Sequence, residues 1–359
     1  MFVSIIVPSY NHAQYLEERI NSILNQSYSQ FELILLDDLS PDHSAKILEK
    51  YRKHPKVSHC IINEKNSGST FYQWNKGMHL AKGELIWIAE SDDIADPRFL
   101  EKLVPQFEKN HNLVLAYSQS YRMNAKGEIT GSWKDFTDQV DPKLFENNFE
   151  MKGLEYIEKF LNTQNTIPNA SGVIFKKQTY FDVGGANPSL RFIGDWEIWA
   201  KIVTQGDIFF THECLNYFRY HNTSVIAQAK KKKDHFEVRR QVILFRQSMS
   251  QFLKAYSHQH PEANKAYQIN QRCLSKELRK NASLAIRRRY YNRIMPTCIT
   301  ALETLPFYIV PIYILKLLIQ LILSICFVAP YKALIYAELS GDFPLGDSRQ
   351  PTYKSLRPF

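Results

Sequence analysis

The sequence has few cysteines. Five occur in 359 residues, at positions 60, 214, 273, 298 and 326, and no two of them form a Cys-x-x-Cys pair. An odd number at wide spacing argues against a disulfide scaffold, a zinc site and a dithiol redox centre. We therefore expect reduced, mostly structural thiols, as in a cytosolic catalytic domain.

The sequence also lacks several signals that would indicate other classes of protein. Residues 1–7 run directly into an apolar strand pattern, without the basic start and cleavage site of a secretory signal. Residues 8–12 (PSYNH) do not form the glycine-rich phosphate loop of a nucleotidyltransferase or a dinucleotide-binding protein. No helix-turn-helix, zinc or RNA-binding signature is present, so no nucleic acid partner is expected.

Acidic residues are scarce relative to basic ones in residues 225–300. Residues 225–300 hold 17 Lys and Arg but 4 Asp and Glu, a net charge of +13, whereas the whole chain carries +9. The remainder is therefore slightly acidic, at −4, and the basicity is local. A basic segment of this kind indicates an anionic partner, either a membrane surface or a nucleic acid.

The first 120 residues alternate short apolar runs with helical periodicity. Strands are predicted at residues 3–7, 31–36, 57–62, 85–89 and 113–117. Amphipathic helices are predicted between the first four of these strands. Repeated βαβ units predict an α/β fold with a Rossmann-type, mostly parallel sheet flanked by helices, and with ligands at the carboxyl ends of the strands.

The alternation fades after residue 120. Residues 124–148 are expected to form hairpins or a loop, followed by helices near 153–161 and 195–204 and short strands at 172–175 and 208–211. We therefore predict a domain at residues 1–224, with a nucleotide-binding half (1–120) and an acceptor half (121–224). Residues 225–359 are predicted to form a basic helical region.

Residues 305–329 are almost continuously apolar, with two prolines near the start and Lys316, Gln320 and Ser324 at intervals of four. This spacing places a thin polar stripe on one side of a helix. A helix lying in the membrane interface, a marginal membrane span and a buried core helix all remain possible. We expect membrane association at the cytoplasmic face, because arginines precede the segment.

Polar residues follow three of the predicted strands where they end. Residues 8–11 (PSYN), 37–38 (DD) and 90–93 (ESDD) would converge at one edge of a parallel sheet. Clustered carboxylates there can bind a metal ion and a nucleotide. Each motif also has a simpler interpretation, since Asp commonly caps helices and the Tyr10 ring could belong to the core.

Several segments together resemble family 2 glycosyltransferases. The resemblance covers residues 1 to about 225, and its motifs are, in order, residues 3–11 (VSIIVPSYN), 22–27 (SILNQS), 32–38 (ELILLDD), 66–68 (NSG), 75–77 (NKG), 81–84 (AKGE) and 91–93 (SDD). It implies a GT-A fold and inverting transfer of a sugar from a nucleotide-diphosphate donor.

The resemblance also implies site residues. Pro8, Tyr10 and Asn11 would line the nucleotide site, in which Tyr10 and Asp38 would hold the base. Asp92 would bind the ribose, and Asp93 would bind a divalent cation, Mg²⁺ or Mn²⁺, on the diphosphate.

Two later motifs would complete the site. Asp195, in residues 194–199 (GDWEIW), would be the catalytic base, with Glu197 as a substitute candidate. Its basicity would require burial, because the helix dipole lowers the pKa of an acid at a helix N-terminus. His221, in residues 219–221 (RYH), would reach the metal or the diphosphate, although it could also be structural.

Three positions depart from the family pattern. Glu90 stands where Asp is common, Trp74 where Arg is common, and Gly194 where Glu is common. None of these departures removes Asp38, Asp93 or Asp195, so activity is still expected.

These observations predict a glycosyltransferase that prefers a UDP-sugar donor and acts on a glycan or polyprenyl-linked acceptor, in cell-surface polysaccharide biosynthesis. The competing hypothesis is a catalytically idle protein with the same fold that binds a membrane surface or a nucleic acid.

Overall fold

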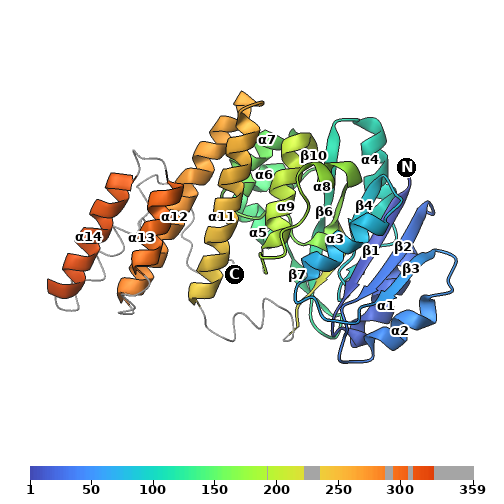
Figure 1. Ribbon diagram of the computed structural model, residues 1–359. Coiled ribbons are helices and arrows are strands. Elements are labelled where there is room, and N and C mark those ends of the chain that lie inside the picture. The colour runs from blue at the N-terminus through green and yellow to red at the C-terminus, as the bar shows by residue number, and fades with distance from the viewer. Residues whose placement is uncertain (192, 222–234, 288–293, 306–309, 327–359) are drawn as a thin grey trace. The chain divides into compact units, whose positions relative to one another are not determined.

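The computed structural model describes residues 1–191, 193–221, 235–287, 294–305 and 310–326 (Figure 1). The chain divides into two compact units, unit 1 (Met1–Gln228) and unit 2 (Ala229–Phe359). The predicted boundary at residues 224/225 lies outside the described residues, so the predicted division stays a prediction.

Unit 1 is built on one ten-stranded sheet in the order β3-β2-β1-β4-β9-β6-β10-β5, with β7 on β6 and β8 on β10. Six strands (β1 to β4, β6 and β10) run in one direction, which confirms the predicted mostly parallel α/β sheet. The strands are β1 (Val3–Ser9), β2 (Phe31–Asp37), β3 (Val57–Ile62), β4 (Leu85–Ile88), β5 (Ile94–Ala95), β6 (Leu113–Met123), β7 (Ile129–Ser132), β8 (Phe149–Lys152), β9 (Val173–Lys176) and β10 (Asp207–Arg219).

Helices connect these strands, and the first three are the predicted crossovers. The unit 1 helices are α1 (Ala13–Leu24), α2 (Ser44–Tyr51), α3 (Thr70–Leu80), α4 (Phe99–Lys109), α5 (Lys134–Val140), α6 (Pro142–Phe145), α7 (Gly153–Tyr156), α8 (Lys177–Asp182) and α9 (Gly194–Ile202), with short turns η1 (Ile157–Leu161), η2 (Ala170–Gly172) and η3 (Val203–Gln205). β1, β2 and β4 are buried along their whole length, which is the physical reason for their unbroken apolar sequence.

The second half of unit 1 differs from the predicted pattern in three ways. β6 and β10 are longer than expected, and residues 124–148 contain the helices α5 and α6 in addition to the predicted hairpin, which β7 forms with β6. The short strand β9 runs antiparallel between β4 and β6. Periodicity reports which residues are buried but not the direction of a strand, so this insertion could not be seen in the sequence.

Unit 2 is helical in its described part, as predicted. It contains α11 (His235–Ser257), η4 (Pro261–Ala263), α12 (Asn264–Arg287), α13 (Ile294–Thr304) and α14 (Val310–Cys326). An apolar cluster joins these helices, with Leu274 and Leu278 of α12 against Tyr313 and Leu317 of α14. Within the described ranges, none of the helices combines the length and the apolar character that crossing a bilayer requires.

Helix α3 connects three parts of unit 1 through side chains of a single turn. The Gln73 Nε2 group donates a hydrogen bond of 2.8 Å to Asp38 after β2, and the Trp74 Nε1 group donates one of 2.8 Å to Glu90 after β4. Phe71 lies against Gly194 at the start of α9, where an added Cβ would come within 2.5 Å of the ring. One helix therefore sets the positions of two strand ends and of the α9 N-terminus.

The three departures from the family pattern belong to this one arrangement. Trp74 and Glu90 are hydrogen-bonded to each other, and the ring centroids of Trp74 and Phe71 are 4.9 Å apart. A side chain at position 194 would collide with the Phe71 ring. The Trp74 indole is therefore buried next to the Glu90 carboxyl group, to which it donates. Gly194 leaves room for the Phe71 ring.

The hydrogen bond between Trp74 and Glu90 predicts that two conservative substitutions have unequal effects on the free energy of unfolding. Trp74→Phe removes the donor to the Glu90 carboxyl and should lower the free energy of unfolding by about 1–3 kcal/mol, because a buried acceptor loses its partner. Glu90→Gln keeps an oxygen that the indole can donate to, and should cost clearly less. Thermal unfolding followed by circular dichroism measures both. Equal losses in the two variants would contradict this role for the hydrogen bond.

Candidate active site

The ends of β1 and β2 are tied together by their backbones. The Asp38 N–H donates to the Ser9 carbonyl at 2.9 Å, and the Asn11 N–H donates to Ser40 Oγ at 3.0 Å. Asn11 and Leu39 both have positive φ angles, 60° and 57°, an uncommon backbone conformation for residues other than glycine. The ends of β1 and β2 together form the shaped edge, where hydrogen bonds between them stabilise the uncommon backbone conformations of Asn11 and Leu39.

Tyr10 is exposed at this edge, with 48% of its surface accessible, so it is not part of the core. Pro8 is buried inside β1, where it pairs with Leu36 of β2. Asn11 follows Tyr10 and is exposed. The structure therefore places an accessible ring where the base-stacking residue was predicted, and that role stays a prediction.

Asp38 is buried and its carboxylate already has four donors. Asn63 Nδ2 and Gln73 Nε2 donate to Oδ1 at 2.8 Å, while Ser67 donates its backbone N–H to Oδ1 at 3.0 Å and its hydroxyl to Oδ2 at 2.8 Å. Four donors fill the acceptor capacity of a carboxylate. The predicted contact with a base stays a prediction, and a base N–H would have to replace one of these donors.

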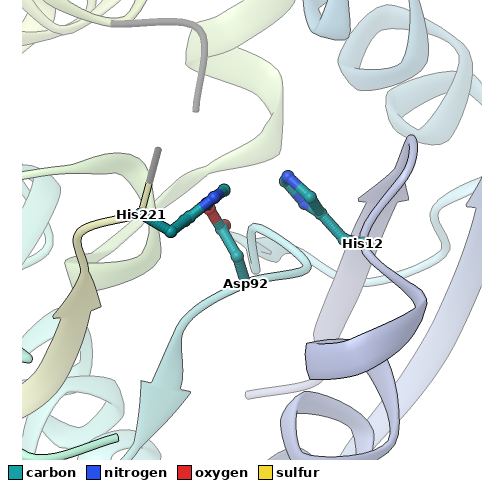
Figure 2. A group of neighbouring side chains, drawn as sticks. All are labelled: His12, Asp92 and His221. Atoms are coloured by element: carbon teal, nitrogen blue, oxygen red, sulfur yellow. The ribbon is translucent and has the colours of Figure 1, made fainter. Parts of the chain in front are cut away.

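Asp92 meets two histidines at the end of β4 (Figure 2). His221 Nε2 lies 2.8 Å from Asp92 Oδ2, and one ligand atom from each of His12, Asp92 and His221 lies within 4.8 Å of the others. His12 follows β1, Asp92 follows β4 and His221 follows β10, so the convergence depends on the sheet order. Figure 2 shows the three side chains converging on one point.

The electrostatics of this group favour an ionised carboxylate. Burial acts to raise the pKa of Asp92, but the nearby imidazoles of His12 and His221 outweigh it and hold that pKa below its usual value. The His12 ring is oriented by its Nδ1 atom, which lies 2.8 Å from Ser91 Oγ. Two imidazoles and one carboxylate at this separation form a donor set that fits a divalent cation.

Asp93, the predicted metal ligand, has other partners. It is 1% exposed, and it accepts hydrogen bonds from Asn169 Nδ2 at 2.8 Å and from the Arg219 backbone N–H at 2.9 Å. Burial, together with the negative charge of Asp92, raises its pKa to about 7. The structure therefore joins Asp92, and not Asp93, to the histidine group, while both predicted roles stay predictions.

Arg219 connects the ends of β10 and β4 to α1. Its guanidinium donates to the Asp92 carbonyl at 2.7 Å and to Glu18 at 2.6 Å, and it lies 4.5 Å from the centre of the Tyr15 ring. These contacts engage the guanidinium within the protein. Of the two basic residues in the predicted closing motif, Arg219 contacts the Asp92 backbone carbonyl, and His221 contacts the Asp92 carboxylate.

A second arginine lies beneath the acidic residues. Arg19 of α1 is fully buried, its guanidinium carbon lies 4.9 Å from the centre of the Trp87 ring, and within the described part of the chain its nitrogens have no hydrogen-bond partner. Burial lowers its pKa to about 10, opposed by the negative charges of Asp93, Asp92 and Glu90. Arg19 supplies positive charge near three carboxyl groups.

Asp195 occupies the first turn of α9, as predicted, and is mostly buried. Burial raises its pKa to about 6, although the Trp196 backbone N–H donates to its carboxylate at 2.8 Å and acts in the opposite direction. Burial therefore gives Asp195 the raised pKa that a catalytic base needs. Glu197, the substitute candidate, forms a buried ion pair with Lys201 at 2.8 Å. The assignment of the base to Asp195 stays a prediction.

The sequence pattern did not identify His12 as a site residue, and it did not show that Asn63, Ser67 and Gln73 donate to Asp38. His12 directly follows the first strand motif, but a single histidine after a strand carries no signal until its neighbours are known. Asn63, Ser67 and Gln73 lie 25 to 35 residues from Asp38. Their convergence depends on the packing of α3 against the sheet.

This chain is similar in sequence to several known proteins. Residues 4–178 match the profile of glycosyl transferase family 2. An uncharacterized glycosyltransferase of Methanocaldococcus jannaschii is 31% identical over 179 residues, which are 45% of this chain and 61% of that protein. The chain thus spans about three fifths of that relative's length. A putative teichuronic acid biosynthesis glycosyltransferase of Bacillus subtilis is 27% identical over 240 residues, 66% of this chain and 87% of that protein.

A solved structure agrees in fold. The crystal structure of TarS residues 1–349 from S. aureus, in complex with UDP-GlcNAc, aligns with a TM-score of 0.61 at 18% identity, and covers 95% of this chain and 91% of that one. At this identity the likeness establishes the fold alone. The range of the family match includes the first four strands, the strand-end motifs and the acidic end of β4, and residues 4–178 of the N-terminal unit therefore form a glycosyl transferase family 2 domain.

Proposed function

We propose that this protein transfers a sugar from a nucleotide-diphosphate donor to a hydroxyl group, with inversion. The observation that carries the proposal is the convergence of His12, Asp92 and His221 beside the shaped edge formed by β1 and β2, within a family 2 domain. This edge offers a ring for a base and a group of ligands for the metal-bound diphosphate. In a catalytically idle protein with the same fold, the competing hypothesis, this combination of a ring and metal ligands would have no function.

We propose that His12, Asp92 and His221 hold the divalent cation. This assignment moves the metal from Asp93 to Asp92, because Asp93 is buried and engaged by Asn169 and Arg219. Two imidazole ligands favour Mn²⁺ over Mg²⁺, since Mg²⁺ prefers oxygen ligands. When bound, the cation would act as a Lewis acid that neutralises charge on the nucleoside-diphosphate leaving group.

The metal assignment predicts selective losses of Mn²⁺ binding. His221→Ala and His12→Ala should each weaken Mn²⁺ binding in the presence of UDP by at least about tenfold, because each removes one ligand. Titration calorimetry measures the binding without requiring turnover. His111→Ala, at an exposed histidine, is the matched control and should bind normally. If Asp93→Asn abolished binding while both histidine variants bound normally, the metal would belong to Asp93.

We propose Asp195 as the base that accepts the proton of the acceptor hydroxyl. A carboxylate with a pKa near 6 is ionised at neutral pH and is a stronger base than an exposed Asp. The α3 contacts connect its helix to the end of β4, because Phe71 packs on Gly194 while Trp74 donates to Glu90. One turn of α3 therefore contacts both the residue before the base and the strand end that leads to the cation site.

Replacing this base has consequences for both rate and stability. Asp195→Asn should lower kcat by about 10²–10⁴-fold. The wild-type rate should fall as the pH drops through about 6, where the base becomes protonated. The folded state raises this pKa, so ionisation of Asp195 destabilises the fold above pH 6, and Asp195→Asn should be more stable there by up to about 3 kcal/mol.

This stability gain should disappear below about pH 4, where Asp195 is protonated in both the folded and the unfolded chain. Thermal unfolding across pH measures the effect, and Asp138→Asn, at an exposed carboxylate, is the control. A variant that lost activity but gained no stability at pH 8 would contradict the buried, ionised state of Asp195.

We propose a UDP-sugar as the donor. The TarS structure of the same fold was solved with UDP-GlcNAc, and the exposed Tyr10 ring is suited to stack on a base. The acceptor is proposed to be a glycan or polyprenyl-linked sugar of a cell-surface polysaccharide, in line with the name of the B. subtilis relative.

The stacking role predicts weaker nucleotide binding in Tyr10→Ala. Loss of one base–aromatic stack should weaken UDP binding by about 5- to 150-fold, the equivalent of about 1–3 kcal/mol. Tyr72→Ala is the matched control, because Tyr72 has a similar exposure of 52% and lies on α3. Calorimetry with UDP, GDP and dTDP provides the comparison. Equally tight binding of GDP would contradict a uracil-selective site.

A further inference from the structure

We propose that α13 and α14 of unit 2 form a docking surface for an anionic lipid membrane. In the described part of unit 2, every exposed large apolar side chain lies on these two helices, and together they make the apolar outer face: Ile299, Leu302, Leu315, Leu318 and Ile319. This proposal does not depend on the activity proposed above.

The apolar outer face is not the face that holds unit 2 together. Tyr313 and Leu317 of α14 are buried, at 0% and 5% exposure, against α12. Leu315 and Leu318 lie on other sides of the same helix and are 59% and 51% exposed. Because α14 is apolar on its exposed positions as well as on its packed ones, core formation explains only part of its sequence.

Exposed leucine side chains on two neighbouring helices indicate an apolar partner. Single exposed apolar residues are ordinary, but a cluster on neighbouring helices marks an interaction surface. α13 also buries Ala301 while Leu302 is 59% exposed. In the described part of α14 the charged residue is Lys316, a cation whose long side chain can reach lipid headgroups from an immersed helix.

Charge selects the partner. α12 carries six Lys and Arg against one Asp or Glu, and the connection to α13, residues 288–293, contains three more arginines. The one acidic side chain of α12, Glu277, is paired with Arg239 and Lys280. An anionic bilayer attracts such a segment and accepts the adjacent apolar helices at its interface.

Two other occupants lack this complementarity. A second copy would bring together two segments that each carry +13 over residues 225–300, and like charges oppose that contact. Residues 327–359 of the same chain hold four basic and three acidic residues, so they supply no net negative charge. Among these candidates an anionic lipid surface alone matches both the apolar and the basic character.

The test is cosedimentation of the full chain with lipid vesicles. Wild-type protein should bind vesicles that contain phosphatidylglycerol, bind phosphatidylcholine vesicles at least tenfold more weakly, and lose binding at high salt. Leu315→Glu combined with Leu318→Glu should lower the partition coefficient by more than tenfold. Ile129→Glu is the matched control, because Ile129 on β7 of unit 1 is similarly exposed, at 57%. Circular dichroism verifies that each variant is folded.

Equal binding by the wild type and the double variant would overturn the proposal. It would also be overturned if the wild type were a dimer that the double variant converts to a monomer, with no binding to vesicles by either, because the face would then be a protein interface. Hydrolysis of UDP-sugar is measured in parallel. Wild-type protein that hydrolyses UDP-sugar but does not bind anionic vesicles contradicts the docking surface alone, whereas wild-type protein that binds vesicles without hydrolysis contradicts the proposed activity alone.

Discussion

Three carboxyl groups, those of Glu90, Asp92 and Asp93, lie within four residues of one another after β4. The site depends on how the protein compensates for removing these groups from water. A buried carboxylate is unfavourable unless hydrogen-bond donors or positive charges compensate for lost hydration. Each of the three takes a donor from a different element: Glu90 from Trp74 on α3, Asp92 from His221 after β10, and Asp93 from Asn169 and the Arg219 backbone. Because their donors come from different elements, the hydrogen bonds to these three carboxyl groups bring those elements together at the end of β4.

The same requirement explains why the site is spread along the whole of unit 1. The donors to the acidic residues come from positions between 74 and 221, and Arg19 and Arg219 add positive charge near them. Asp38 at the end of β2 is satisfied in the same way, by residues that follow β3 and by α3. A shell of this kind holds functional groups in place before any ligand arrives.

Unit 2 follows a different physical rule. Its described helices join through a modest apolar cluster, and α13 and α14 retain exposed leucine and isoleucine beside a basic helix. A family 2 domain that acts on a lipid-linked acceptor would benefit from contact with a membrane, since the acceptor would be restricted to its surface. The two proposals are therefore compatible, although they rest on separate observations.

Much of the fold could be predicted from residues 1–120, because strands buried on both faces have unbroken apolar sequences and their crossover helices have one apolar stripe. The antiparallel direction of β9 could not, because burial patterns are the same for both directions. The ordered motifs singled out Tyr10, Asp92, His221 and Asp195, whose roles stay predictions. His12 was not found, because one histidine gains meaning only from Asp92 and His221 beside it.

The sequence by itself determined the α/β alternation, the family and the acidic end of β4, because these depend on local pattern and order along the chain. The tertiary structure alone decided which carboxylate meets the histidines, and it showed that Trp74, Glu90 and Gly194 are parts of one arrangement. Adjacent side chains in a turn point in different directions, and sequence order alone does not show which of Asp92 and Asp93 faces the histidines. The two carboxylates become different when β10 and η2 place different donors around each of them.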